Sequence, residues 1–228
     1  MSLKPKVLLG VSLCDRYDYC LDKFLDAVKK LDYDDFDLVI IDNSSSLDYC
    51  DKLKSLGLNV VHVIPGDFVR GTLVKCRNYL RSKALSEGYD YLFTVDSDVI
   101  LPSDVLTKLI SHNKKVVCGL YYSRYKINGI MMTLPVLWKF DGENIKFFLP
   151  EEVEKGQLLK IRATGSGCML IHKDILKDFE FRWDEKIMAF DDVFFCEDLI
   201  KAGQDLYCDT SIKCFHWAKG KSWQNVQK

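Results

Sequence analysis

The sequence lacks an excess of charge of either sign. Its 228 residues include 32 lysines and arginines and 33 aspartates and glutamates, which gives a formal net charge of −1 at pH 7. Nucleic acids and acidic membranes attract proteins through a broad positive field. The overall charge provides no such field, and no nucleic-acid partner is expected.

Paired cysteine motifs and long apolar runs are absent as well. The nine cysteines are an odd number with no C-x-x-C spacing, and several, such as Cys118, Cys168 and Cys196, lie in apolar runs. This pattern is typical of buried thiols in a reducing compartment, and it disfavours a disulfide framework or a zinc cluster. The polar N-terminus leads into a short apolar run, so we expect no signal peptide, transmembrane segment or amphipathic anchor. The expected protein is soluble and cytoplasmic.

Short apolar runs alternate with helical patterns through the first 120 residues. The predicted strands are Val7–Val11, Leu38–Ile41, Val60–Ile64, Tyr91–Val95 and Val116–Leu120. Apolar stripes at helical spacing run from Leu21 to Val28 and from Leu73 to Ala84, and a third helix is predicted to start near Pro102. This alternation predicts an α/β fold with a mainly parallel central sheet and helices on both of its faces.

The pattern changes after residue 120. Asp141-Gly142, a strong hairpin dipeptide, separates the predicted strands Ile130–Phe140 and Asn144–Leu149, which indicates an antiparallel excursion. Further along we predict a charged loop at Glu151–Gly156, strands at Leu158–Ala163, Cys168–Ile171, Leu206–Cys208 and Ile212–Phe215, and a helix at Val193–Ala202. The segment Lys219–Trp223 is expected to be mobile. With no repeat or linker evident, the chain is predicted to be a single domain, 1–228.

Two carboxylates one residue apart, Asp96 and Asp98, follow the fourth predicted strand. In an extended segment residues i and i+2 point to the same side, so both can face one site at the carboxyl edge of the sheet. Adjacent anions repel each other, and a divalent cation with a preference for oxygen ligands, Mg²⁺ or Mn²⁺, would neutralise them. The alternative is that one aspartate caps the next helix and the other is solvated.

Several short motifs form a recognisable series when they are taken in chain order. They are Val11-Ser12, Asp42-Asn43-Ser44-Ser45, Arg77-Asn78, Asp96-Ser97-Asp98, Asp191-Asp192 with the following Phe195-Cys196, and His216. Over residues 7–217 this series resembles the GT-A glycosyltransferases, and is similar to their large family-2 group. The resemblance implies a GT-A-type fold, with residues 1–120 as the nucleotide-sugar-binding half and 121–228 as the acceptor and catalytic half.

The resemblance also implies roles at the donor site. Asp42 matches the reader of the nucleobase, although Asp-Asn-Ser-Ser is equally compatible with a simple turn. Arg77 would hold the diphosphate or an aspartate of the Asp-x-Asp pair. Asp96 would approach the ribose, whereas Asp98 and His216 would bind the metal. Donor-binding roles fall as well on two small residues, Ser12 and Gly165, the second of which lies in the tight turn Thr164–Gly167.

Asp191 and Asp192 match the family's acidic catalytic pair. Asp192 would be the general base that takes the acceptor's proton in an inverting displacement, with Asp198 as the second candidate. The pair also stands at a helix start, where acidic residues stabilise the helix dipole. Three tryptophans, Trp138, Trp183 and Trp217, are candidates for stacking on sugars, and Lys219 and Lys221 for contacting the diphosphate.

The function implied is a metal-dependent transfer of a sugar from a nucleotide to a hydroxyl acceptor. The expected cofactor is Mn²⁺ or Mg²⁺, the expected donor a UDP-sugar or, less favoured, a GDP-sugar, and the acceptor a glycan, lipid or protein. The residues leave two alternative functions open. A phosphatase similar to the haloacid dehalogenases could use Asp96 and Asp98, but its motif normally lies on the first strand. A non-catalytic module could bind nucleotide sugars without turning them over. A nucleotidyltransferase is disfavoured because Gly10–Cys14 is not a phosphate loop.

Overall fold

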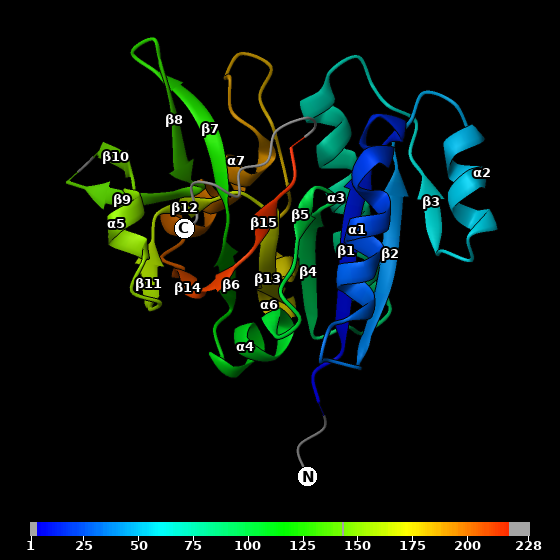
Figure 1. Ribbon diagram of the computed structural model, residues 1–228, viewed down its shortest axis with the longest axis horizontal. Helices are drawn as coiled ribbons and strands as arrows, with labels where there is room; N and C mark the ends of the chain where they lie inside the picture. The colour runs from blue at the N-terminus through cyan, green and yellow to red at the C-terminus, as the bar shows by residue number, and fades with distance from the viewer. Residues whose placement is uncertain (1–3, 143, 219–228) are drawn as a thin grey trace.

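An eight-stranded sheet forms the centre of the protein in the computed structural model, which describes residues 4–142 and 144–218 (Figure 1). In the order in which they pair, its strands are β11 (Leu158–Ile161), β14 (Leu206–Lys213), β6 (Val116–Leu120), β13 (Cys168–His172), β4 (Tyr91–Asp96), β1 (Val7–Leu13), β2 (Phe36–Asp42) and β3 (Val60–His62). The strands from β4 to β3 are parallel, and β14 is parallel to β6. Only β13 and β11 run against their neighbours. The prediction of a mainly parallel central sheet is confirmed.

Helices cover both faces of this sheet, as predicted. The helices are α1 (Asp18–Lys29), α2 (Asp48–Ser55), α3 (Val69–Ser86), α4 (Val105–Ser111), α5 (Pro150–Val153), α6 (Lys173–Asp178) and α7 (Asp191–Lys201), with a short 3-10 helix (Asp15–Tyr17) before α1. One hydrophobic cluster joins α1, α2 and α4 to the sheet, and a second cluster on the other face joins α3, α6 and α7 to it. The stripes at helical spacing supply these contacts, for example Phe24 of α1 and Leu80 of α3, both almost completely buried.

Three small antiparallel sheets are formed mainly by the second half of the chain. They pair β7 (Tyr122–Ile127) with β8 (Ile130–Pro135), β9 (Leu137–Asp141) with β10 (Asn144–Phe147) and β12 (Ala163–Thr164), and β5 (Val99–Ile100) with β15 (Phe215–His216). The predicted Asp141-Gly142 hairpin is present as β9–β10. The single strand predicted over 130–140 is wrong, because the chain leaves one sheet after Pro135, which has no N–H to donate, and enters another at Leu137.

Four other predictions for the second half need correction. The loop expected at 151–156 contains helix α5, whose start is stabilised by Glu152 accepting a hydrogen bond from the backbone N–H of Leu149, at 2.8 Å. Helix α7 begins two residues earlier than predicted, so the acidic pair lies inside its first turn. Strand Leu158–Ala163 is divided between β11 and β12. The two strands expected at 206–208 and 212–215 are instead β14 with an irregular register and the short β15. The segment predicted to be mobile, Lys219–Trp223, lies outside the described residues.

The parallel strands β1 and β4 end at the same edge of the sheet. Ser12 of β1 pairs with Asp96 of β4, so the motifs that follow the two strands meet there. Among the described residues, no helix is long and apolar enough to cross a membrane.

Candidate active site

A cleft of about 930 Å³ opens at the edge where β1 and β4 end. Its size is in the range of small-molecule sites. It is lined by Ser12, Leu13, Cys14, Arg16, Tyr17, Tyr19, Asn43, Ser45, Pro65, Gly66, Val69, Thr72, Leu73, Arg77, Asp96, Ser97, Asp98, Phe190, Asp191, Asp192 and His216. Seven of the nine predicted site residues are thus brought together in one cleft, and Asp42 and Gly165 are not among its lining residues.

The pairing of β5 with β15 places His216 next to Asp98. His216 is opposite Val99 in this two-stranded sheet, and its Nε2 lies 3.3 Å from Asp98 Oδ2. Its Nδ1 is 2.7 Å from the carbonyl oxygen of Tyr122, an acceptor only, so Nδ1 carries the hydrogen and Nε2 faces the carboxylate. Burial, the strongest influence, lowers the pKa of His216, but the hydrogen bond and charge of Asp98 outweigh it and the pKa is raised.

The donor atoms of this pair suit a divalent cation. Carboxylate oxygen is the preferred ligand of Mg²⁺ and Mn²⁺, and an imidazole held by a backbone carbonyl is a frequent metal ligand. Two neighbouring ligands of an octahedral ion with bonds of about 2.1 Å lie about 3 Å apart, close to the separation of Asp98 Oδ2 and His216 Nε2. The residues present therefore fit such an ion.

Arg77 of α3 connects the two acidic motifs. Its guanidinium donates to Asp191 Oδ2 and, at 3.3 Å, to Asp96 Oδ1. Both Arg77 and Asp191 are buried, so each charge neutralises the other where water cannot. Asp191 Oδ1 and Ser12 Oγ are buried without a hydrogen-bond partner in the described part of the chain. Both residues line the cleft.

Asp192 is the carboxyl group whose proton affinity is most suited to acid-base chemistry. Burial raises the pKa of Asp192 to about 6, and the negative charge of Asp191 raises it further than the charge of Arg77 can lower it. Its Oδ1 accepts a hydrogen bond from the backbone N–H of Val193, at 2.7 Å, which orients the carboxyl group. The second candidate, Asp198, is held by two hydrogen bonds from Arg182, at 2.6 and 2.7 Å, and does not line the cleft.

Asp42 faces away from the cleft. Its side chain is completely buried, with Oδ1 accepting from the N–H and hydroxyl of Ser44 and Oδ2 lying 2.7 Å from His62 Nδ1. One ligand atom each from Asp42, Cys50 and His62 lie within 4.8 Å of one another, a cluster that could hold an ion. The carboxylate is already saturated by its protein partners, so we regard this cluster as structural. The base-reading role of Asp42 stays a prediction, whereas the neighbouring Asn43 and Ser45 do line the cleft.

Gly165 is a glycine because of Tyr121. A Cβ at Gly165 would lie 2.1 Å from the Tyr121 hydroxyl, and one at Gly167 would lie 2.8 Å from Asp96 Oδ2. The Tyr121 hydroxyl accepts from the backbone N–H of Gly167, and its ring packs edge-on against His216 with centroids 5.9 Å apart. Tyr121 thus fixes both His216 and the turn beside Asp96. No sequence signal distinguished it from the other tyrosines.

Loop 182–190 leads into the acidic pair and is fixed to the start of α3. The Arg70 guanidinium donates to the carbonyl oxygens of Asp184, Ile187 and Ala189, and it lies over the ring of Trp183. A Cβ on Gly71 would come within 3.0 Å of that ring. Trp183 therefore packs against protein. Trp217 likewise carries the ammonium group of Lys23 over its ring, at 4.5 Å, and Trp138 packs on Phe147.

Comparison with known proteins identifies the family. The model of glycosyl transferase family 2 matches residues 16–179, which include Arg77, Asp96 and Asp98. The chain belongs to glycosyl transferase family 2. The match ends before Asp191, Asp192 and His216, so the family model does not cover these residues. Among curated proteins, no sequence is similar enough for a significant match.

Two solved structures share the fold of this family-2 chain. GalNAc-T7, in a structure with UDP, GalNAc and Mn²⁺, is similar with a TM-score of 0.69 and 16% identity over 96% of this chain and 44% of that one. A197 from STIV is similar with a TM-score of 0.55 and 14% identity over 98% of this chain and 92% of that one. At these identities the likeness shows a GT-A fold alone. The family assignment removes the phosphatase alternative.

Proposed function

We propose that this glycosyltransferase moves a sugar from a nucleotide-sugar donor to a hydroxyl group, with a divalent cation and with inversion at the anomeric carbon. The observation that carries the proposal is that one cleft contains both a pair whose ligand atoms fit a divalent cation, Asp98 and His216, and a carboxyl group with a raised pKa, Asp192. A cation site and a general base are the two components that such a displacement requires.

The donor would lie along the ends of β1 and β4. Asp98 and His216 would hold Mn²⁺ or Mg²⁺, which when bound neutralises the charge that develops on the leaving diphosphate. Asp96 would meet the ribose, while Ser12 offers an unpartnered hydroxyl and Asn43 and Ser45 line the same cleft. GalNAc-T7 was solved with UDP and Mn²⁺. Its fold is the same, so we favour a UDP-sugar here and keep a GDP-sugar as the second choice.

Asp192 would act on the acceptor. The carboxylate takes the hydroxyl proton as the acceptor oxygen forms its bond to the anomeric carbon, and the bond from that carbon to the phosphate oxygen breaks. The electron pair of the broken bond leaves with the diphosphate. Arg77 neutralises Asp191 and keeps the base beside the donor carboxylates. We assign the donor half to residues 1–120 and the acceptor and catalytic half to 121–228 of one domain.

A cytoplasmic site of action is part of the proposal. All nine cysteines are buried and none forms a disulfide, which supports a reducing compartment. The acceptor would be a hydroxyl on a glycan, a lipid or a protein.

Thermal unfolding with a panel of nucleotide sugars tests the donor site. We expect UDP-sugars to raise Tm in the presence of Mn²⁺ or Mg²⁺, by about 5–10 °C at a ligand concentration of about 100 times Kd. Asp98→Ala should abolish the dependence on metal, whereas Asp104→Ala, which changes a half-buried aspartate outside the cleft, should keep it. The absence of a shift with any UDP- or GDP-sugar and metal would contradict the proposal.

A further inference from the structure

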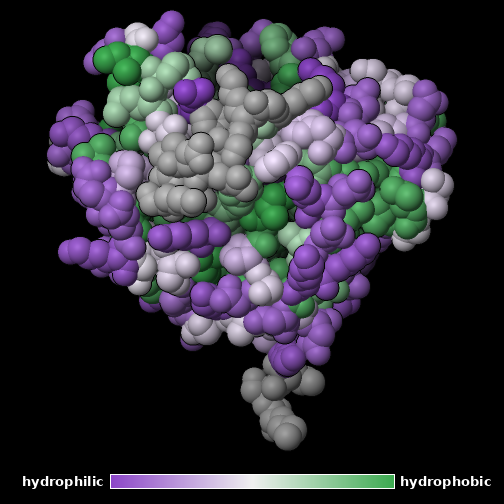
Figure 2. All heavy atoms as spheres, in the orientation of Figure 1, coloured by the Kyte–Doolittle hydropathy of each residue, from purple (hydrophilic) through white to green (hydrophobic). Residues whose placement is uncertain are grey.

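The β7–β8 hairpin exposes apolar side chains at its end. Ile130 is 67% exposed, Met131 49% and Met132 39%. The hairpin projects at the top of Figure 1, the same side on which the cleft opens at the ends of β1 and β4, and Figure 2 shows apolar atoms gathered over it at the upper left. Exposing such side chains to water is unfavourable unless another surface covers them.

The exposed apolar groups occupy both faces of the hairpin. Ile127 pairs with Ile130, and Lys126 pairs with Met131, and residues directly opposite in an antiparallel pair point to the same face. Ile130 and Met131 therefore point to opposite faces. A rigid protein partner or a second copy of the chain would cover one face, whereas a fluid lipid interface surrounds an inserted tip on all sides.

The charge of the hairpin is of one sign. Residues 122–135 contain Arg124 and Lys126 and no aspartate or glutamate. In a chain whose net charge is −1, this is a local positive excess beside an apolar tip. Basic side chains next to inserted apolar ones are the combination that binds anionic lipid surfaces, each contributing about 1 kcal/mol near the surface.

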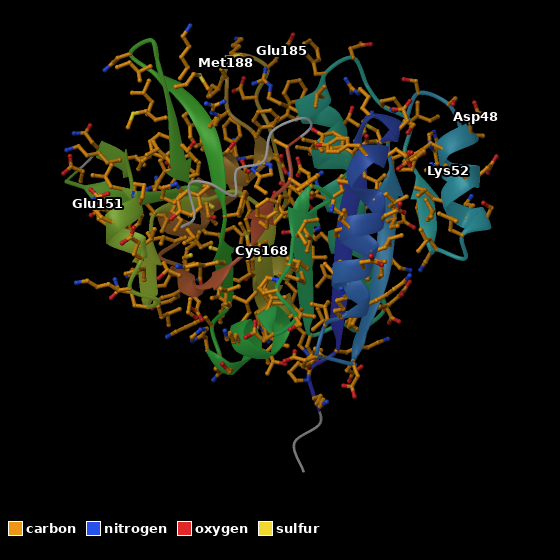
Figure 3. All side chains as sticks on the ribbon, in the orientation of Figure 1. Asp48, Lys52, Glu151, Cys168, Glu185 and Met188 are labelled. Atoms are coloured by element: carbon orange, nitrogen blue, oxygen red, sulfur yellow. The ribbon has the colours of Figure 1, made fainter. Side chains whose placement is uncertain are left out.

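The loop before α7 adds a second apolar tip on this side of the molecule. Met188 is 92% exposed and Ile187 48%. Figure 3 places Met188 at the top of the molecule, where the turn of the hairpin also lies. Asp184, Glu185 and Lys186 precede these residues, and with Arg182 the charges of the loop balance, so it contributes apolar area and no excess of positive charge. Separate tips of this kind would need separate pockets in a rigid partner, and a lipid interface needs none.

We propose that the β7–β8 hairpin docks this protein on an anionic phospholipid surface, with the Ile187–Met188 tip on the same side of the molecule, so that the cleft faces a membrane-borne acceptor. The acceptor class rests on the proposed function, whereas the docking stands on the hairpin alone. Because the cleft opens on the side that bears both tips, a hydroxyl presented by a lipid headgroup would approach Asp192 from the membrane. The cytoplasmic leaflet has the anionic surface that Lys126 requires.

Vesicle sedimentation tests the docking. The full chain is mixed with phosphatidylcholine vesicles that contain or lack phosphatidylserine, and the bound fraction is measured against lipid concentration. We expect binding only with phosphatidylserine, weakened about fivefold by Lys126→Gln and about tenfold or more by Ile130→Ser combined with Met131→Ser. Control variants change a lysine on α2 and an apolar residue just after it, far from the hairpin in Figure 1: Lys54→Gln and Leu56→Ser should bind as the unchanged chain does.

Three outcomes would overturn the proposal. They are no binding of the unchanged chain to vesicles with phosphatidylserine, unchanged binding by the hairpin variants, and a dimer in light scattering that the Ile130→Ser/Met131→Ser variant converts to a monomer. Thermal shift with UDP-sugar and Mn²⁺, measured on the same variants without lipid, separates the two proposals. Vesicle binding without nucleotide binding would reject the transferase function alone, and nucleotide binding without vesicle binding would reject the docking alone.

Discussion

Two adjacent carboxylates, Asp191 and Asp192, differ in their partners and therefore in their chemistry. Asp191 is fully buried and paired with the Arg77 guanidinium, so its charge is neutralised within the protein. Asp192 has no such partner, and its pKa rises to about 6. When the environments of neighbouring titratable groups differ in this way, the one with the shifted pKa is the candidate acid or base.

The first prediction concerns the pH dependence of the reaction. A general base must be deprotonated, so kcat/KM should rise with pH through about 6 and then level off. Asp192→Asn should lower kcat about 10²- to 10⁴-fold and remove this rise, while UDP-sugar binding stays unchanged. Asp198→Asn, the same change on the same helix outside the cleft, is the control and should keep full activity. A flat pH profile in the unchanged enzyme would contradict the role of Asp192.

The second prediction concerns stability. The pKa of Asp192 is raised in the folded state, so between about pH 4 and 6 the unfolded chain releases this proton first and stability falls as pH rises. Above about pH 6 the carboxyl group is ionised in both states, and the folded state is destabilised by the full cost of holding a desolvated charge. Asp192→Asn should therefore raise the free energy of unfolding by about 1–3 kcal/mol at pH 8 and leave it nearly unchanged at pH 3.5. Urea denaturation at the two pH values measures this, and a variant less stable at pH 8 would be inconsistent with a desolvated carboxylate.

The position of a site residue could be predicted from the sequence where the strand before it could be predicted. Asp96 and Asp98 come after five buried residues of β4, and the end of a parallel strand fixes their place at the cleft. Asp42 also follows a strand, but His62, twenty residues later, binds its carboxylate and turns it away. Tyr121 acts through its contacts with His216 and Gly167, which are distant in sequence. Neither contact can be predicted from the residues that surround Tyr121 in the sequence.

Among the elements, a hairpin can be predicted from the sequence when its turn contains a characteristic dipeptide. Asn128 and Gly129, with φ of 48° and 84°, form the turn between β7 and β8, and Asn-Gly is a hairpin dipeptide as strong as the Asp141-Gly142 that was recognised. The β7–β8 hairpin was therefore predictable from its Asn-Gly turn. The pairing of β5 with β15 was not, because two-residue strands have no periodicity and their register depends on the rest of the fold. His216 could be placed only through the family resemblance.

The third prediction belongs to the loop at 182–190. Arg70 anchors it through three backbone carbonyls, and hydrogen bonds from a charged donor contribute about 1.5–3 kcal/mol. Arg70→Gln should therefore speed amide exchange of residues 183–190 about 10- to 100-fold, measured by hydrogen-exchange mass spectrometry. Arg81 binds the carbonyls of Leu176 and Phe179 in the same manner, so Arg81→Gln should loosen residues 176–180 and leave the loop protected. Equal exchange of the loop in both variants would show that Arg70 does not anchor it.

At the scale of the whole molecule, the buried thiols of the central sheet report on global unfolding. Cys118, Cys168 and Cys208 lie in central strands of the sheet and are completely buried, so a thiol reagent reaches them only when the sheet opens. A ligand that binds the folded state alone lowers the open population by the factor 1 + [L]/Kd. Mn²⁺ with UDP-sugar, at about 100 times Kd, should therefore slow labelling of these thiols about 100-fold, although none of them lines the cleft. Mass spectrometry of the labelled peptides measures the rates, and Asp98→Ala should label equally fast with and without ligand. Slower labelling of Cys14, which does line the cleft, without a change at the sheet cysteines would mean that the ligand only shields its own site.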